Sequence, residues 1–380
     1  MLLEMITKRI LDFDYQLPRL FGKFINQREY VTKNDAIGEF DVVFCHREGL
    51  QDSFNELLTY TNSNTKIVVD ITTESGNLQS FLDCFIHTTQ QNPNEFYLII
   101  DSDINYYINK VHIPKNVKIL QGFDLVFFAF LNELSDNTLN NNNQIFSSTN
   151  EFLSLNNSCR LHRVLLLSEL LKRNLPMTNC SFLFSTGGGS GSKFNKEVYI
   201  DCVNNLFESN IINKFEYDNL IRYNLPKNLD YDLNTFTYIH NQINHLYHPI
   251  LNLVTENVMG MSQGDTSPFG MITFTEKIIK PFLAKQIPLF IALPGLQEVL
   301  RNLGFDLFDD LIVTSYEMES NPIYRIKSIV TELERLLQID LIQYKKNNQH
   351  RFDSNYNLLE TLTKSGEEKV KSFLYEEILK

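Results

Sequence analysis

Short apolar runs alternate with amphipathic helical segments along most of the chain, and this alternation constrains the fold more than any other feature. In the first third, continuous apolar runs predict buried strands at 41–45, 66–70 and 95–101. Residues 51–60 and 78–86 between them show helical periodicity. Strands that are apolar at every position are buried on both faces, which is typical of parallel sheets covered by helices.

The remaining elements extend this pattern over the whole chain. Two further strands are expected at 117–120 and 125–130, and residues 218–231 are expected to be irregular. The second half is expected to contain helices at 160–171, 275–285, 296–303, 324–337 and 358–377, and strands at 180–184, 249–254 and 289–293. The polar stretch 134–150 predicts a linker. We therefore expect an α/β fold with two Rossmann-like domains facing a cleft, residues 1–150 and 151–380.

Composition excludes several classes of protein. The net charge of −12 argues against a broad basic surface for duplex DNA, although a few Arg and Lys residues suffice for a small anion. No apolar run is long enough to span a bilayer, and the first residues, MLLEMITKRILDFDY, lack the features of a signal peptide. A cytoplasmic protein is expected. The five cysteines are scattered without a C-x-x-C pair, which predicts reduced, mostly buried thiols.

One candidate site lies at the start of the helix expected from residue 275. Thr275 is a candidate N-cap, and Lys277 and Lys280 share one face of the helix. Cations at a helix N-terminus oppose its dipole, but a bound anion reverses that effect. Glu276 is suited to bind a ribose diol. The alternative interpretation is a solvated amphipathic helix start.

A second candidate site is the helix start at Arg160, His162 and Arg163. Two arginines on one face of a helix N-terminus favour a bound anion. His162 could relay a proton or bind a phosphate oxygen. The alternative interpretation is a surface arginine pair beside a packed histidine.

Two further segments carry weaker signals. Gly187 and Gly188, in a Gly/Ser loop after a strand, could let backbone approach a phosphate, but the loop does not match a P-loop and could equally be a linker. Asp101 and Asp103 end an apolar strand, where two carboxylates at i and i+2 could chelate a divalent cation. An aspartate after a strand is also common as a turn or helix cap.

Three segments together resemble a known group of proteins. The stretch TEKIIKPFLAKQIPLFIALPGLQEVLRNLGFDLFDDLIVTSYE, from Thr275, resembles the C-terminal part of phage and giant-virus glycosyltransferase-like proteins of the two-domain GT-B type. More distantly, it is similar to the donor-binding helix of fucosyltransferase-type enzymes. NLVTEN at 252–257 and the helix at 160–170 match the same group in the expected order, so the resemblance covers about residues 152–330.

The resemblance implies a glycosyltransferase that needs no metal and moves a sugar from a nucleotide sugar to an acceptor hydroxyl. Glu276 would hold the donor ribose and Lys277 or Lys280 the pyrophosphate. At least one arginine of the helix at 160–170 would bind donor phosphate, and Glu256 would lie at a strand end in the same cleft. Asn257 and Ile278 depart from the pattern of the group, which usually has Thr, and Thr or Trp, there.

The acceptor side is less constrained. In a GT-B enzyme a base from the N-terminal domain activates the acceptor hydroxyl, and candidates at strand ends are His46, Glu48, Asp70 and Asp101, with His46 and Glu48 preferred. A glycan, a protein or a modified nucleic-acid base could be the acceptor, in the host cytoplasm if the protein is viral. Two alternatives stay open. One is a metal-dependent GT-A-like transferase that uses Asp101 and Asp103, and the other is a non-catalytic module that binds a nucleotide or nucleic acid.

Overall fold

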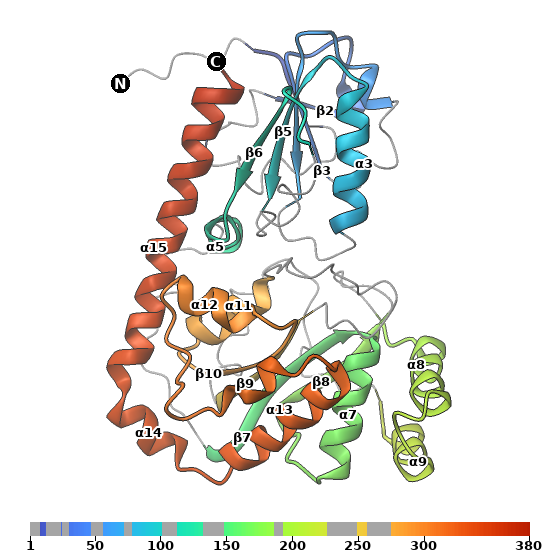
Figure 1. Cartoon of the computed structure of the whole chain (residues 1–380), viewed down its shortest axis with the longest axis vertical. Coiled ribbons are helices and arrows are strands. Elements are labelled where there is room, and N and C mark those ends of the chain that lie inside the picture. The colour runs from blue at the N-terminus through green and yellow to red at the C-terminus, as the bar shows by residue number, and fades with distance from the viewer. Residues whose placement is uncertain are drawn as a thin grey trace. The chain divides into compact units, whose positions relative to one another are not determined.

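The chain forms two compact units, each built on one parallel sheet (Figure 1). Unit 1 comprises residues 1–133, 267–276 and 360–380, and unit 2 comprises residues 134–266 and 277–359. The structure, a computed structural model, describes residues 8–12, 24, 30–46, 56–71, 78–100, 112–131, 148–185, 193–225, 249–256 and 275–380.

The sheet of unit 1 has six parallel strands in the order β2-β1-β3-β4-β5-β6. Its strands are β1 (Ile10–Asp12), β2 (Tyr30–Thr32), β3 (Val42–His46), β4 (Lys66–Asp70), β5 (Glu95–Ile100) and β6 (Val117–Gln121). The continuous apolar runs of the sequence form β3, β4 and β5 in the interior of this sheet, so these predictions are confirmed.

Both faces of this sheet are buried. Alternate residues of each strand point to opposite faces, so Val43 and Ile67 belong to the core cluster beneath α3 (Leu78–Gln90). Val42 and Val68 belong to the cluster on the other face, which α5 (Asp124–Leu131) and the end of the chain cover. This double burial explains why the strands carry no alternating polar residues.

Residues 125–130 form α5 instead of the expected strand. A short run of apolar residues cannot be assigned to strand or helix by periodicity alone. Leu125, Val126, Phe127 and Phe128 are all fully buried. A helix buried on every side needs no polar face, and the absence of one made the run resemble a strand.

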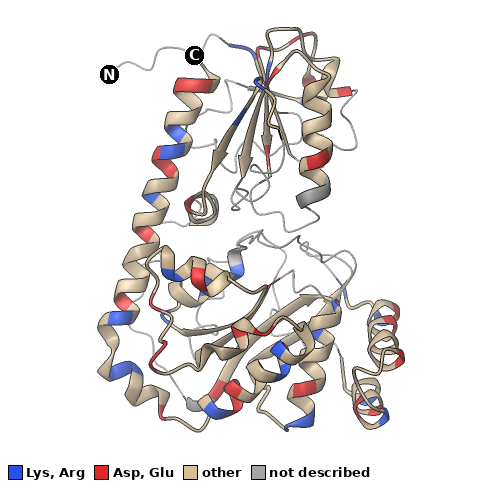
Figure 2. Ribbon diagram, in the orientation of Figure 1, with Lys and Arg blue, Asp and Glu red and all other residues tan. Residues whose placement is uncertain are grey.

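The C-terminal helix α15 (Gln349–Phe373) completes the core of unit 1. Charges of both signs lie along this helix (Figure 2). Val370 and Phe373, with Leu374 from the π-helical turn that follows, pack in the same cluster as β3 and α5.

The predicted division into domains therefore changes. Residues 360–380 pack with unit 1, and the boundary between the units follows residue 133 rather than 150.

At Gly366 the helix α15 packs directly against α5. A Cβ atom at this position would lie 2.4 Å from the backbone oxygen of Asp124 and 2.8 Å from the Cβ of Phe128. The Asp124 carboxylate, which is buried, accepts hydrogen bonds from Ser365 (2.7 Å) and Lys369 (2.9 Å). Only glycine allows the two helices this separation.

The sheet of unit 2 has four parallel strands in the order β10-β9-β7-β8. The strands are β7 (Ser148–Ser158), β8 (Cys180–Ser185), β9 (Pro249–Thr255) and β10 (Ile287–Ile291). The helices are α7 (Leu161–Lys172), α8 (Lys196–Glu208), α9 (Lys214–Arg222), α11 (Glu276–Leu283), α12 (Leu296–Asn302), α13 (Pro322–Leu336) and α14 (Leu341–Asn347).

The sequence does not predict β7 or α9. The interior strand β7 includes buried Ser154 and Asn156, so it lacks the continuous apolar run by which the other strands were recognised. The expectation of irregular structure at 218–231 is wrong for its first residues, because α9 extends to Arg222. A capping box starts this helix, in which the side chains of Asn213 and Glu216 bond to each other's backbone N–H. No helix in the described part of the chain is long and apolar enough to cross a membrane.

Candidate functional site at the strand-order reversal of unit 2

The topology of unit 2 points to one edge of its sheet. From β7 the chain passes through α7 to β8 on one side, whereas β9 lies on the other side of β7 and leads to β10. The strand order therefore reverses between β7 and β9. In open parallel sheets ligands bind outside the carboxyl ends of the strands at this reversal. A ligand site is therefore expected beside the last residues of β7 and β9.

The first turn of α7 joins the ends of these two strands. His162 Nε2 lies 3.0 Å from the backbone oxygen of Glu256, directly after β9. Arg163 donates to the backbone oxygen of Ser158 at the end of β7 (3.1 Å) and to that of Thr255 at the end of β9 (3.4 Å). Segments far apart in the sequence, selected there as candidate donor-site residues, therefore meet at the strand-order reversal.

Burial separates the roles of the three α7 residues. His162 and Arg163 are 0% and 1% exposed, so their side chains hold the strand ends together rather than facing solvent. Arg160, at the N-cap position, is only half-buried. Among the three, Arg160 is therefore the residue with a surface that a ligand can reach.

The N-terminus of α7 is suited to an anion. The helix has no side-chain cap and no acidic residue in its first turn. By contrast, side chains of Asn195, Asn213, Asn321 and Asp340 cap the starts of α8, α9, α13 and α14. A negative group near Arg160 would offset both the dipole of α7 and the arginine charges.

His162 is neutral and has a defined tautomer. Burial, together with the charges of Arg163 and Arg160, holds the pKa of His162 well below its usual value. Because Nε2 faces a carbonyl oxygen, Nε2 carries the hydrogen and Nδ1 is an acceptor. A neutral acceptor cannot donate to a phosphate oxygen, so the expectation that His162 binds phosphate does not agree with this geometry.

Three buried polar atoms at this edge have no hydrogen-bond partner within the described ranges: Asn156 Oδ1, His162 Nδ1 and Thr255 Oγ1. Their residues are each at most 2% exposed. Buried polar groups in proteins are nearly always paired, so such atoms call for a water or a ligand group. Asn156 Oδ1 and His162 Nδ1 can only accept a hydrogen bond, whereas Thr255 Oγ1 can accept or donate. Hydroxyl or N–H groups of a ligand would therefore satisfy all three atoms. Sequence reasoning did not select Asn156 or Thr255, because a small polar residue in a strand gives no sign in the sequence that its hydrogen bonds are unmade.

The predicted donor-binding residues of α11 are placed in part. Thr275 is buried and directly precedes the helix, while Lys277 and Lys280 are half-buried within it. The side chain of Glu276, the first helical residue, lies outside the described set. Since α11 connects β9 to the parallel strand β10, it runs against the strands and starts at their carboxyl edge. Glu256 is 5% exposed at the same edge.

The other candidate residues lie elsewhere or cannot be described. Glu48, Gly187, Gly188, Asp101 and Asp103 fall outside the described residues.

His46 is the last residue of β3, and only its backbone is described. It pairs with Asp70, the last residue of β4, which is buried. The strand order of unit 1 reverses between β1 and β3, so His46 stands at that reversal. The neighbouring strand end carries Asp12, a 1% exposed acid that sequence reasoning did not select.

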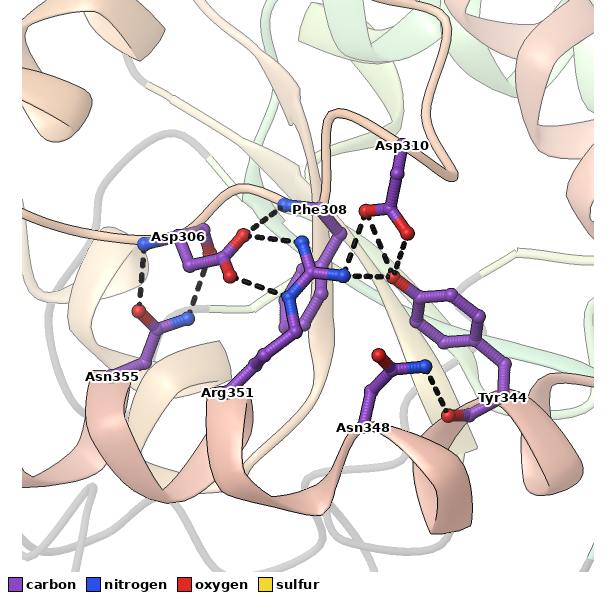
Figure 3. Close-up of polar contacts among 7 residues, drawn as sticks. All are labelled: Asp306, Phe308, Asp310, Tyr344, Asn348, Arg351 and Asn355. Carbon is purple, nitrogen blue, oxygen red and sulfur yellow. Dashed lines mark hydrogen bonds and ion pairs between the residues drawn. The ribbon is translucent and has the colours of Figure 1, made fainter.

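The acids of the LGFDLFDD segment have a structural role. Asp306 and Asp310 hold Arg351, near the start of α15, through contacts of 2.7 Å each, and the Tyr344 hydroxyl accepts from the same guanidinium (Figure 3). The side chain of Asn355 bonds both the N–H and the C=O of Asp306 (Figure 3). This part of the resemblance therefore marks an anchor for the last helix.

Comparison with family models, curated proteins and solved structures found no match. Among the residues that the structure describes, no group of three His, Cys, Asp or Glu side chains could hold a metal ion.

Proposed function

We propose that the chain is a glycosyltransferase that moves a sugar from a nucleotide sugar to an acceptor hydroxyl, with its donor site at the β7–β9 edge of unit 2. The observation that carries the proposal is the meeting of the α7 start with Glu256 across the strand-order reversal. The resemblance assigned both segments to one donor site. Their contact supports that assignment, because the fold places them where a parallel sheet binds ligands.

The roles of the residues follow from their burial and charge. Arg160 contacts the donor phosphates, assisted by the N-terminus of α7 and by Lys277 or Lys280 of α11. Glu276 holds the ribose diol. Asn156 and Thr255 take the hydroxyl or N–H groups that their open hydrogen-bonding positions require.

His162 and Arg163 act as positioning residues, because their buried side chains contact the backbone oxygens at the end of β9. Cationic side chains and a helix dipole stabilise a departing nucleoside diphosphate without a metal ion. The acceptor hydroxyl needs a base to activate it, and His46 at the end of β3 is our candidate for that base.

A thermal-shift panel of nucleoside diphosphates and nucleotide sugars tests the donor site. A ligand at a hundred times its Kd stabilises the folded state by about 2.7 kcal/mol. Such stabilisation raises the melting temperature of a unit of about 200 residues, the size of unit 2, by about 5–10 °C. We expect the shift to shrink in Arg160→Ala, Glu276→Ala and Lys277→Ala. It should persist in Arg222→Ala, which removes an exposed cation at the far end of α9. If no nucleotide raises the melting temperature of the wild type, the donor site is refuted.

Transfer assays separate the proposal from its alternatives. Sugar release from the stabilising donor, measured with and without chelator, should be the same under both conditions. Loss of activity in chelator would instead favour the metal-dependent alternative, and Asp101→Asn and Asp103→Asn should then abolish it. Nucleotide binding without release or transfer from any sugar donor would favour the non-catalytic module.

A further inference from the structure

Two of the five cysteines meet at the carboxyl edge of the unit 2 sheet. The thiol of Cys159, which follows β7, lies 3.7 Å from that of Cys202 on α8 and donates a hydrogen bond to it. Both side chains are half-buried. The sequence predicts mostly buried thiols, but only Cys45 and Cys180 are buried, and Cys84 is exposed. The spacing of Cys159 and Cys202 in the sequence gave no sign of the pair.

The backbone on both sides of the pair is well anchored. The N–H of Cys159 donates to the backbone oxygen of Ser185 at the end of β8 (2.8 Å). The start of α8 is capped by Asn195, and Tyr199 of the same helix stacks on Phe184 of β8 with ring centroids 5.3 Å apart. The two sulfur atoms are therefore held as neighbours by the strands and the helix.

We propose that Cys159 and Cys202 form a dithiol site that a peroxide oxidises to an intramolecular disulfide, which ties α8 to the junction of β7 and α7. A disulfide requires about 2.05 Å between the sulfurs. The contact of 3.7 Å must therefore shorten by roughly 1.7 Å when the bond forms. This proposal does not depend on nucleotide binding.

The two cysteines have different chemical roles. The hydrogen bond from Cys159 lowers the pKa of the Cys202 thiol, while the same bond and burial raise the pKa of Cys159. Cys202 is therefore the thiolate that attacks the peroxide, since the thiolate is the reactive form.

The reaction consists of two steps. Cys202 Sγ bonds to one peroxide oxygen, the O–O bond breaks, and the departing hydroxide takes up a proton to become water. Cys159 Sγ then attacks Cys202 Sγ, so that the S–O bond of the sulfenic acid breaks and the S–S bond forms. The thiol proton and the departing hydroxide leave as a second water. The peroxide is reduced by two electrons, and the two thiols together are oxidised by two.

Peroxide treatment followed by thiol alkylation under denaturing conditions and peptide mapping tests the proposal. We expect the full-length wild type to yield a cross-linked pair of peptides that contain Cys159 and Cys202. Dithiothreitol should reverse the cross-link. At least a tenfold loss of it is expected in Cys159→Ser and in Cys202→Ser, while Cys84→Ser should retain it as the matched control.

Two results would overturn the proposal. One is a wild type in which peroxide modifies exposed Cys84 while Cys159 and Cys202 stay available to the alkylating reagent. The other is cross-linking that involves buried Cys45 or Cys180 as often as Cys202, because that pattern reports unfolding rather than a preformed pair. Both results are read from the wild type, so the test stands even if a serine variant fails to fold.

Discussion

Replacing Thr255 with valine should stabilise the ligand-free protein, although most core substitutions destabilise. Thr255 is 2% exposed, and its hydroxyl has no hydrogen-bond partner among the described residues. Valine has nearly the same shape and also favours a strand. Thr255→Val therefore removes a buried polar group without losing a hydrogen bond that the structure shows.

The magnitude follows from the cost of burying an unpaired hydroxyl, which mutational data put at about 1–3 kcal/mol. We expect a gain of about 1–2 kcal/mol, which corresponds to a rise in melting temperature of about 2–8 °C for a unit of this size. Thr65 supplies a matched control of opposite sign. It is 0% exposed, but its hydroxyl donates to the backbone oxygen of Phe40 (2.6 Å) and accepts from the N–H of Asn62 (2.9 Å). Thr65→Val should therefore lower the melting temperature by a similar amount.

Thermal melts of the two variants and the wild type, without ligand, provide the measurement. A nucleotide titration of Thr255→Val should then show binding about 3–10 times weaker, because one hydrogen bond to the ligand is lost. The reasoning is refuted if Thr255→Val melts at or below the wild-type temperature. That result would mean that a water satisfies the hydroxyl in the folded protein and that no open ligand position exists there.

Three other substitutions test the structure away from the site. Arg351→Met should cost about 2 kcal/mol at pH 7 by removing the ion pairs of Arg351 with Asp306 and Asp310. Arg351 lowers the pKa of Asp306 from 3.8, so the stabilisation is present above pH 3.8 and is lost as the pH falls below it. The free energies of unfolding of variant and wild type, measured in urea, should therefore converge as the pH falls below 3.8. Gly366→Ala should lower the melting temperature by several degrees by forcing α15 from α5, whereas exposed Glu368→Ala on the same helix should have little effect. Burial lowers the pKa of Lys345 to about 7, so the lysine binds its proton more tightly in the unfolded chain than in the folded one. The free energy of unfolding should therefore rise between pH 7 and about 10. Lys345→Met should flatten that rise in denaturant titrations.

The sequence predicts those parts of the fold in which burial is uniform along an element. β3, β4 and β5 are apolar at nearly every position because helices cover both faces of their sheet. The same rule failed for β7, whose buried Ser154 and Asn156 look like loop residues until the neighbouring strands are known. It also failed for α5, whose apolar run belongs to a helix that is buried on every side and not to a strand.

The candidate site shows a similar limit. The grouping of Arg160, His162 and Arg163 with Glu256 was expected from the order of the matching segments. A packed His162 was one of the two interpretations, but the enclosure of Arg163 was not expected, because its burial depends on β9 lying beside β7. The LGFDLFDD segment carried part of the resemblance, but the structural role of its acids could not be predicted, because their partner Arg351 lies in a helix that the sequence had no reason to place beside them.

The return of the chain to unit 1 through α15 has a consequence for how the protein is made. Part of one face of the unit 1 sheet is covered by Val370, Phe373 and Leu374, which are synthesised after all of unit 2. At about 5–20 residues/s, on the order of tens of seconds separate the synthesis of β6 from that of these residues. During this time the part of the apolar sheet face that α5 does not cover stays exposed to water and prone to aggregation. The first unit to be translated is therefore the last to be finished.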